Sequence, residues 1–139
     1  MAIERIVVAS DMSETASRAV AWAAEMAQRY EAELTIVKAC VPGPAPPALE
    51  IELATYAERM CGPGTRARVA CADDPASAIV AAAEAENADV LVVGNIGMAG
   101  RKEFLLGNVP NRVSHNARCT VVIVNTAEEP KKRRFWSKS

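Results

Sequence analysis

Three glycines in the last third of the chain are spaced so that the backbone between them could surround a phosphate group. Gly94 and Gly97 are separated by two residues, and Gly107 follows after nine more, directly before Asn108 and Val109. Glycine lets the backbone approach a ligand closely, and the free N–H groups at the start of a helix attract anions. The segment therefore predicts a phosphate held between this loop and a helix that begins at Asn108.

This spacing differs from the two most familiar phosphate-binding patterns. The Rossmann fingerprint places its glycines before the first helix of the fold, and the Walker A loop requires a Gly-Lys-Ser or Gly-Lys-Thr sequence. The chain carries neither pattern. Taken alone, the glycines are equally compatible with a loop whose shape serves only packing.

An acidic turn near the N-terminus is the second candidate for chemistry. Asp11 follows the apolar stretch 3–9 and precedes Ser13. A carboxylate can accept hydrogen bonds from both hydroxyl groups of a ribose edge. It can equally cap the helix that follows, a role that Ser13 could also take. The residue types alone leave both roles open.

Apolar, β-branched stretches alternate along the chain with stretches of helical periodicity. The proline-rich segment 42–47 is predicted to be a loop, and Asp73-Asp74-Pro75 is predicted to start a helix. Strands that are apolar throughout belong inside parallel sheets, so the chain is predicted to be an α/β protein with a five-stranded parallel sheet and helices on both faces. The predicted strands are 3–9, 33–41, 66–72, 89–93 and 120–124, and the predicted helices are 14–30, 49–61, 76–86 and 108–116.

The order of these elements predicts where a ligand would bind. Doubly wound sheets bind ligands at the carboxyl ends of their strands, at the point where the winding direction reverses. If the first strand is central, that point lies between the first and the fourth strands. The loops 10–14 and 94–107 then meet, so the acidic turn and the glycine-containing segment are predicted to form one site.

Longer stretches around these two loops carry a family resemblance. They are Val92-Val93-Gly94-Asn95-Ile96-Gly97, Leu105-Leu106-Gly107-Asn108-Val109-Pro110, Val121–Val124 and the opening Ile6–Glu14. Together they closely resemble the universal stress protein family, over residues 2–126. The resemblance implies a Rossmann-like sheet of the adenine nucleotide alpha hydrolase type, with strand order 3-2-1-4-5. It also implies ATP binding through the pattern Gly-x₂-Gly-x₉-Gly-Ser/Thr.

The resemblance assigns a role to each matching residue. Asp11 would contact the ribose or the adenine side, and Ala39 and Val93 would lie beside the adenine. The glycines would surround the ribose and phosphates, and the backbone N–H groups after them would bind phosphate. The nucleotide-binding residues implied in this way are Asp11, Ala39, Val93, Gly94, Gly97, Gly107, Asn108 and Val109.

Asn108 departs from the family's ATP pattern, which has Ser or Thr at that position. An Asn amide can donate to phosphate, but the side chain is larger and its oxygen repels phosphate. The same motifs also look like a subgroup of the family that binds cyclic AMP. ATP, with or without Mg²⁺, is therefore the first expectation. AMP or cyclic AMP is the alternative, and a nucleotide-independent protein-interaction module is a third.

No spacing in the chain pairs a nucleophile with a base. His115 is the only histidine and is expected at the surface, while Arg101 and Lys102 could either meet phosphates or face solvent. The sequence therefore predicts a non-enzymatic protein of stress response or signalling. Slow ATP hydrolysis would be incidental to that role.

The four cysteines, at positions 40, 61, 71 and 119, form no Cys-x-x-Cys pair. A zinc site would need four well-placed ligands, and the chain has one His and no close-spaced ligand pair. The N-terminus lacks a basic region followed by a long apolar one, so no signal peptide is expected. We therefore expect a cytoplasmic protein without a bound metal, in which the cysteines are free, buried thiols.

Charge divides the chain into a domain, residues 1–126, and a basic tail, residues 127–139. Five of the 16 basic residues lie in the last nine positions, which hold no acid, so the remainder is acidic overall. This distribution and an aromatic content of 4% argue against nucleic-acid binding, and no apolar run is long enough to span a membrane. The tail is expected to be disordered or a linker, or to contact a partner or an anionic surface.

The last predicted strand, Thr120–Val124, would lie at an edge of the sheet. An exposed apolar edge can pair with a second chain. Because members of the resembling family often dimerise through this strand, a homodimer is expected.

Overall fold

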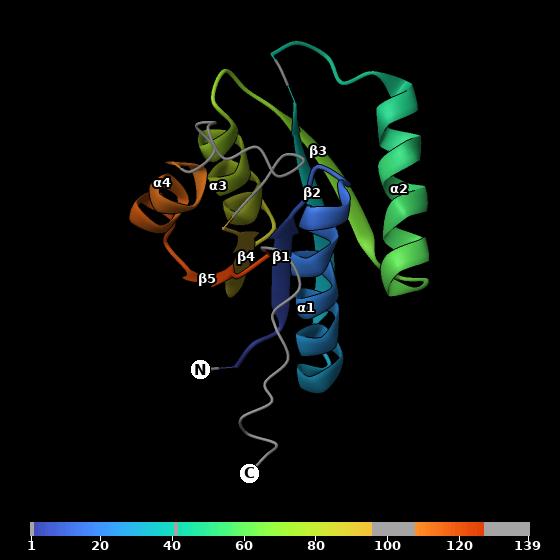
Figure 1. The fold of residues 1–139 in the computed structure, drawn as a ribbon, viewed down its shortest axis with the longest axis vertical. Coiled ribbons are helices and arrows are strands. Elements are labelled where there is room, and N and C mark those ends of the chain that lie inside the picture. The colour runs from blue at the N-terminus through green and yellow to red at the C-terminus, as the bar shows by residue number, and fades with distance from the viewer. Residues whose placement is uncertain (1, 41, 96–107, 127–139) are drawn as a thin grey trace, which may run out of the picture.

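A computed structural model describes residues 2–40, 42–95 and 108–126 of the chain. Strands and helices alternate, and the strands form one parallel sheet in the order β3-β2-β1-β4-β5, as predicted (Figure 1). The elements are β1 (Arg5–Ala9), α1 (Glu14–Tyr30), β2 (Glu33–Cys40), α2 (Pro47–Cys61), β3 (Arg66–Cys71), α3 (Pro75–Ala85), β4 (Val90–Gly94), α4 (Asn108–Asn116) and β5 (Thr120–Val124).

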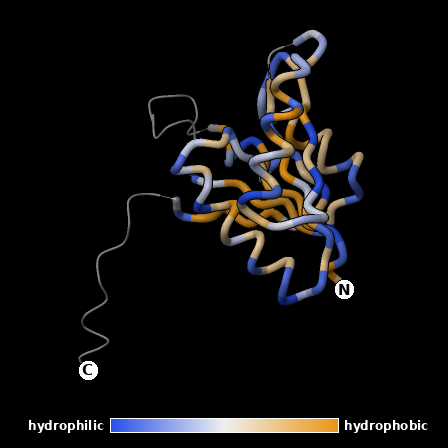
Figure 2. Tube along the Cα trace, turned by 90° about the vertical axis from the view of Figure 1, so that its right-hand side faces the viewer, coloured by the Kyte–Doolittle hydropathy of each residue, from blue (hydrophilic) through white to orange (hydrophobic). Residues whose placement is uncertain are grey.

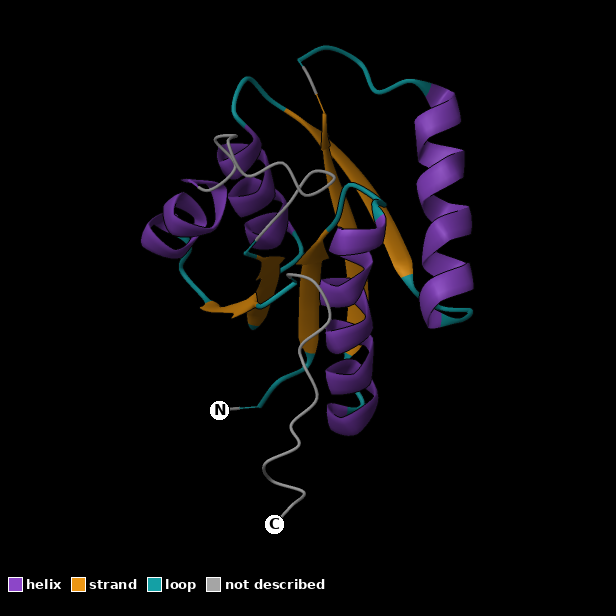
Figure 3. Cartoon of the chain, in the orientation of Figure 1, coloured by secondary structure: helices purple, strands orange, loops and turns teal. Residues whose placement is uncertain are grey.

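Helices cover both faces of the sheet (Figure 3). Successive side chains of a strand point to opposite faces. Ile6 and Val8 of β1 therefore pack against α1 and α2, whereas Val7 packs on the other face, against α3 and α4. The two hydrophobic layers explain why β1 after Arg5 and β4 before Gly94 are apolar on both faces. The strands form the apolar interior in Figure 2.

Small side chains let the helices lie close to the sheet. Ala19, Val20 and Ala23 of α1 have no exposed surface, and they pack over the buried side chains of β1 and β2. A core built from Ala, Val, Ile and Leu is what the low aromatic content of the sequence requires. Tyr56, on α2, is the one aromatic residue of this layer among the residues described, and its hydroxyl has polar partners.

Two elements begin two residues away from their predicted starts, and the bounds of β2, β3, α3 and β4 differ from the prediction by one residue. Helix α2 begins at Pro47, inside the segment predicted to be a loop, because proline is compatible with the first helical position. Strand β1 begins at Arg5, because the Asp89 carboxylate accepts the N–H groups of Glu4 and Arg5, at 2.8 and 2.9 Å. These two hydrogen bonds hold the pKa of Asp89 below its usual range.

The expectation of four free thiols was wrong for two of them. Cys40 and Cys71 form a disulfide between β2 and β3, with their Cα atoms 4.5 Å apart. The two residues are aligned in the parallel register, which a separation of 31 positions in the sequence does not reveal. Cys61 and Cys119 are free, but they are only partly buried.

No helix among the described residues is long and apolar enough to cross a membrane. The predicted basic tail, residues 127–139, lies outside the described residues, as do Arg101 and Lys102.

Candidate functional site

A pocket opens at the carboxyl edge of the sheet, between the ends of β1, β2 and β4 and the starts of α3 and α4. It lies where β1 separates β2 from β4, which is the point of reversal predicted from the element order. Its lining is mainly apolar. The lining residues are Ala9, Ser10, Asp11, Ala16, Val37, Lys38, Ala39, Pro75, Ile79, Val93, Gly94, Val109 and Pro110.

Most of the residues singled out in the sequence meet at this pocket. Asp11, Ala39, Val93, Gly94 and Val109 all line it, although they come from three different elements and a turn. The first residue of α4 is Asn108, directly before Val109. Gly97 and Gly107 lie outside the described residues.

The acidic turn after β1 is fixed by hydrogen bonds on both sides. The Ser10 N–H donates to the Val37 carbonyl at 2.9 Å, and the Ser10 hydroxyl accepts from the Met12 N–H at 2.9 Å. Met12 has a φ of 68°, in the left-handed region that side chains other than glycine rarely adopt. Because the surrounding bonds hold this unfavourable conformation, the turn presents Asp11 to the pocket in a defined position.

One oxygen of Asp11 has a structural role. The Asp11 Oδ1 atom accepts from the Ser13 N–H at 2.9 Å, while Ser13 caps α1 by accepting from the Ala16 N–H at 3.1 Å. Ser13 is therefore the N-cap of α1, and the ribose contact expected of Asp11 stays a prediction. A carboxylate has about four lone pairs, so one bond to a backbone N–H leaves Asp11 able to accept hydroxyl groups from a ligand.

A cluster of hydroxyl groups supports the turn from behind. The Tyr56 hydroxyl lies 3.3 Å from the Ser10 hydroxyl and 2.7 Å from the Ser17 hydroxyl. Tyr56 and Ser10 are buried, at 4% and 7% exposure. Buried polar groups need partners, so these bonds connect α2, α1 and the acidic turn.

Asn95 anchors the start of the glycine-containing loop. Its N–H donates to the Val124 carbonyl at 2.9 Å, and its side-chain oxygen accepts from the N–H of Thr126 at 2.9 Å. The Thr126 carbonyl in turn accepts from Arg18 at 2.9 Å. Asn95 thus joins the end of β4 to the chain after β5 and to α1, a role that its place in a motif does not reveal.

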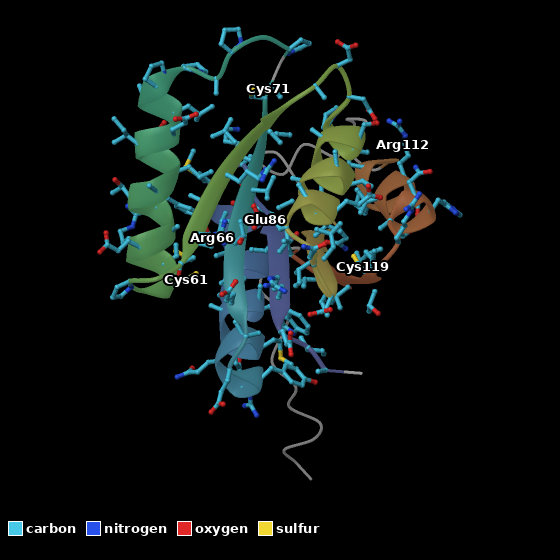
Figure 4. All side chains as sticks on the ribbon, turned by 180° about the vertical axis from the view of Figure 1, so that it is seen from behind. Cys61, Arg66, Cys71, Glu86, Arg112 and Cys119 are labelled. Carbon is cyan, nitrogen blue, oxygen red and sulfur yellow. A yellow bond between two sulfur atoms is a disulfide. The ribbon has the colours of Figure 1, made fainter. Side chains whose placement is uncertain are left out.

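An ion pair fixes the wall made by the two helices. The two terminal guanidinium nitrogens of Arg112, on α4, donate to the two oxygens of Asp74, the N-cap of α3, at 2.6 and 2.7 Å. Asp74 also accepts from the Ser77 N–H and hydroxyl, at 3.1 and 2.8 Å. The Arg112 bonds, followed by those from Ser77, hold the pKa of Asp74 below its usual range, and Asp74 raises the pKa of Arg112. Figure 4 labels Arg112 on α4.

Several lining residues were missed by the sequence reasoning. Lys38 is the only cation in the described lining, and Ile79 and Pro75 supply the α3 side. Lys38 could have been found from its place beside Ala39 at the end of a strand, whereas the α3 residues required the packing of that helix.

The described part of the pocket does not combine a nucleophile with a histidine. His115 is exposed on α4 and is not among the lining residues. No three His, Cys, Asp or Glu side chains gather at a metal-binding distance in the residues described. The lining offers a small apolar slot, one carboxylate, one amine and backbone groups at a helix start. Groups of these kinds can bind a base, a sugar and an anion.

Residues 2–125 match the sequence profile of the universal stress protein family. The chain belongs to the universal stress protein family. A universal stress protein of Thermus aquaticus is 32% identical over 132 residues, which cover 86% of this chain and 96% of the relative. Universal stress protein Slr1101 of Synechocystis sp. is 35% identical over 81 residues, which cover 58% of this chain. The matched part is 65% of that relative, slightly less than two thirds of its length.

The fold is that of universal stress proteins of known structure. A universal stress protein crystallised in complex with cyclic AMP superimposes with a TM-score of 0.71 at 32% identity, covering 91% of this chain and 100% of the other. The strand order 3-2-1-4-5 that the resemblance implied is therefore confirmed, both by this likeness and by the sheet itself.

Proposed function

We propose that this protein binds an adenine nucleotide at the carboxyl edge of its sheet and acts as a non-enzymatic stress-response or signalling protein. The observation that carries the proposal is the convergence of Asp11, Ala39, Val93, Gly94 and Val109 on one pocket. Small apolar side chains leave room for a flat base, and a carboxylate with free lone pairs suits a ribose. The start of α4 supplies free N–H groups for phosphate.

Among the adenine nucleotides, two observations favour cyclic AMP or AMP over ATP. Asn108 stands where the family's ATP pattern has Ser or Thr. The universal stress protein that is 32% identical to this chain was crystallised with cyclic AMP. A single phosphate needs fewer donors than a triphosphate, so the substitution at position 108 is less costly for a monophosphate.

Calorimetric titration of the purified protein with cyclic AMP, AMP and ATP, with and without Mg²⁺, tests this function. We expect one site per chain, with cyclic AMP or AMP binding more tightly than ATP. Ala39→Leu should abolish binding, because three added carbons fill the slot beside Val93. The control is Ala21→Leu, the same change at an exposed position of α1, which should bind as the unmodified chain does. Equal binding by Ala39→Leu, or no binding by folded protein free of nucleotide, would overturn the proposal.

We further propose that the protein is a cytoplasmic homodimer joined through β5. The two sheet edges differ in a way that supports this choice. The edge strand β3 carries Arg66 and Arg68, which form ion pairs with Glu86 at 3.5 and 2.9 Å (Figure 4). Charged side chains on an edge strand disfavour pairing with a second chain. In contrast, β5 is apolar after Thr120, and its Ile123 is 45% exposed.

A further inference from the structure

We propose that the Cys40–Cys71 pair is a reversible redox switch that sets the affinity of the pocket for its nucleotide. This inference rests on the nucleotide-binding function proposed above. Cys40 and Cys71 are the last residues of β2 and β3, and they face each other in the register of the sheet. With Cα atoms 4.5 Å apart, they can form a disulfide without movement of the strands.

The disulfide lies between two segments that border the pocket. Ala39, which lines the pocket, directly precedes Cys40. Beyond Cys71, the chain reaches Asp74, the cap of α3, and Pro75, which also lines the pocket. The Ala72 N–H donates to the Cys40 carbonyl at 3.1 Å and continues the strand pairing past the disulfide. The bond therefore holds the base side of the pocket and the start of α3 in one arrangement.

The ion pair of Asp74 with Arg112 extends this connection to the phosphate side. Arg112 lies on α4, one turn after Val109, so a shift of the α3 start would also displace the start of α4. Loss of the disulfide would thus loosen both sides of the pocket. Pre-organised sites bind more tightly because less ordering accompanies binding.

The position of the pair allows exchange with small molecules. Both cysteines are only partly buried, at the open edge of the sheet. The free thiols, Cys61 and Cys119, lie toward the opposite edge, as Figure 4 shows, and burial raises the pKa of each. A raised pKa leaves less thiolate at neutral pH, so Cys61 and Cys119 exchange slowly. Cys40 and Cys71 lie opposite each other in the sheet and can close a disulfide with each other. In the cytoplasm proposed above, disulfides are usually transient or redox-sensing.

The reaction is thiol–disulfide exchange with a small-molecule disulfide such as oxidised glutathione. One cysteine thiolate attacks the small disulfide, forms a mixed disulfide and releases one small thiolate. The second cysteine thiolate attacks the protein sulfur of the mixed disulfide and releases the second small thiolate. Two electrons pass from the cysteines to the small disulfide, and the two cysteine protons end on the two released thiols. A small dithiol reverses the reaction.

The test compares the full chain after treatment with oxidised glutathione or with dithiothreitol. Titration of thiols in denaturant should find two in the first sample and four in the second, since the chain has four cysteines and one pair. Calorimetry with cyclic AMP and AMP should give roughly tenfold tighter binding for the oxidised chain, a typical magnitude for coupling between two sites. The double variant Cys61→Ser/Cys119→Ser should keep the whole response, because it retains the pair.

The double variant Cys40→Ser/Cys71→Ser should bind with the affinity of the reduced chain under both conditions. If it does not fold by circular dichroism, the reduced chain provides the same comparison without a substitution. Four free thiols after oxidation, or equal nucleotide affinity in the two states, would overturn the switch while leaving the proposed function intact. Absence of nucleotide binding in both states would overturn the proposed function and the switch together.

Discussion

At the scale of single residues, one side chain can combine a structural role with a place in the lining of the pocket. Asp11 holds the turn before α1 through the Ser13 N–H, and it lines the pocket. Asn95, in contrast, lies in the glycine motif but has a structural role, because it forms hydrogen bonds with Thr126 and Val124. Motif membership therefore does not by itself distinguish a ligand contact from a structural anchor.

Asp11→Asn should weaken nucleotide binding by about tenfold or more, because a hydrogen bond to a charged acceptor contributes roughly 1.5–3 kcal/mol. The Asn side chain keeps one oxygen for the Ser13 N–H, so thermal unfolding should change little. Asp73→Asn is the control, since Asp73 is exposed at the same edge and does not line the pocket. Calorimetry with cyclic AMP measures the effect, and unchanged affinity in Asp11→Asn would exclude Asp11 from ligand contact.

At the scale of elements, the sequence predicted those features that depend on local periodicity. Helix α1 spans Glu14–Tyr30 as predicted, because small apolar residues recur on one face and Ser13 caps it. The start of α2 at Pro47 was missed, since proline suits both a loop and a first helical turn. The Cys40–Cys71 pair was missed because it depends on the register of two strands that are separated by a helix.

The pocket lies where the order of the elements predicted a ligand to bind. The meeting of the turn after β1 with the end of β4 follows from parallel strands and a central first strand. The contribution of α3, through Ile79, could not be predicted, because it depends on how closely a helix of alanines packs on the sheet. The Asp74–Arg112 pair likewise requires the three-dimensional packing of α3 against α4.

The Asp74–Arg112 pair should give the stability a specific pH dependence. The folded pKa of Asp74 lies below its unfolded value, so its contribution is fully present above about pH 4 and is lost as pH falls through the folded pKa. Asp74→Asn keeps a capping side chain and loses the ion pair, so its melting temperature should be lower than that of the unmodified chain at pH 7.

That difference in melting temperature should shrink as the pH falls below about 4, where Asp74 takes up a proton in the unfolded chain, and should vanish below the lowered pKa of the folded protein. Both proteins retain Asp89, whose pKa is also lowered, so the comparison isolates Asp74. Thermal unfolding followed by circular dichroism from pH 7 to pH 2 provides the measurement. A difference that stays constant across this range would show that the ion pair does not stabilise the contact between α3 and α4.

At the scale of the whole molecule, the two edges of the sheet are unequal. The charged edge at β3 and the apolar edge at β5 point to one preferred direction for pairing with a second chain. The pocket opens at a third side, at the carboxyl ends of β1, β2 and β4. A dimer through β5 would therefore leave the pockets of both chains open to ligand.

Ile123→Lys should convert the proposed dimer into a monomer, because a buried lysine at the strand interface would lose its hydration without a partner. Ile51→Lys is the control, since Ile51 is 68% exposed on α2 and far from β5 in the fold. Sedimentation equilibrium measures the mass of each variant. A monomeric unmodified chain, or a dimeric Ile123→Lys variant, would contradict pairing through β5.

The location of the bound nucleotide is the central claim, and chemical-shift mapping of ¹⁵N-labelled protein with cyclic AMP tests it most directly. We predict saturable shifts of the amide signals of Asp11, Ala39 and Gly94, at the carboxyl edge of the sheet. Signals of Glu31 and Asn87, at the opposite edge, should not move. Shifts confined to the opposite edge, or no saturable shifts with cyclic AMP, AMP or ATP, would contradict the account.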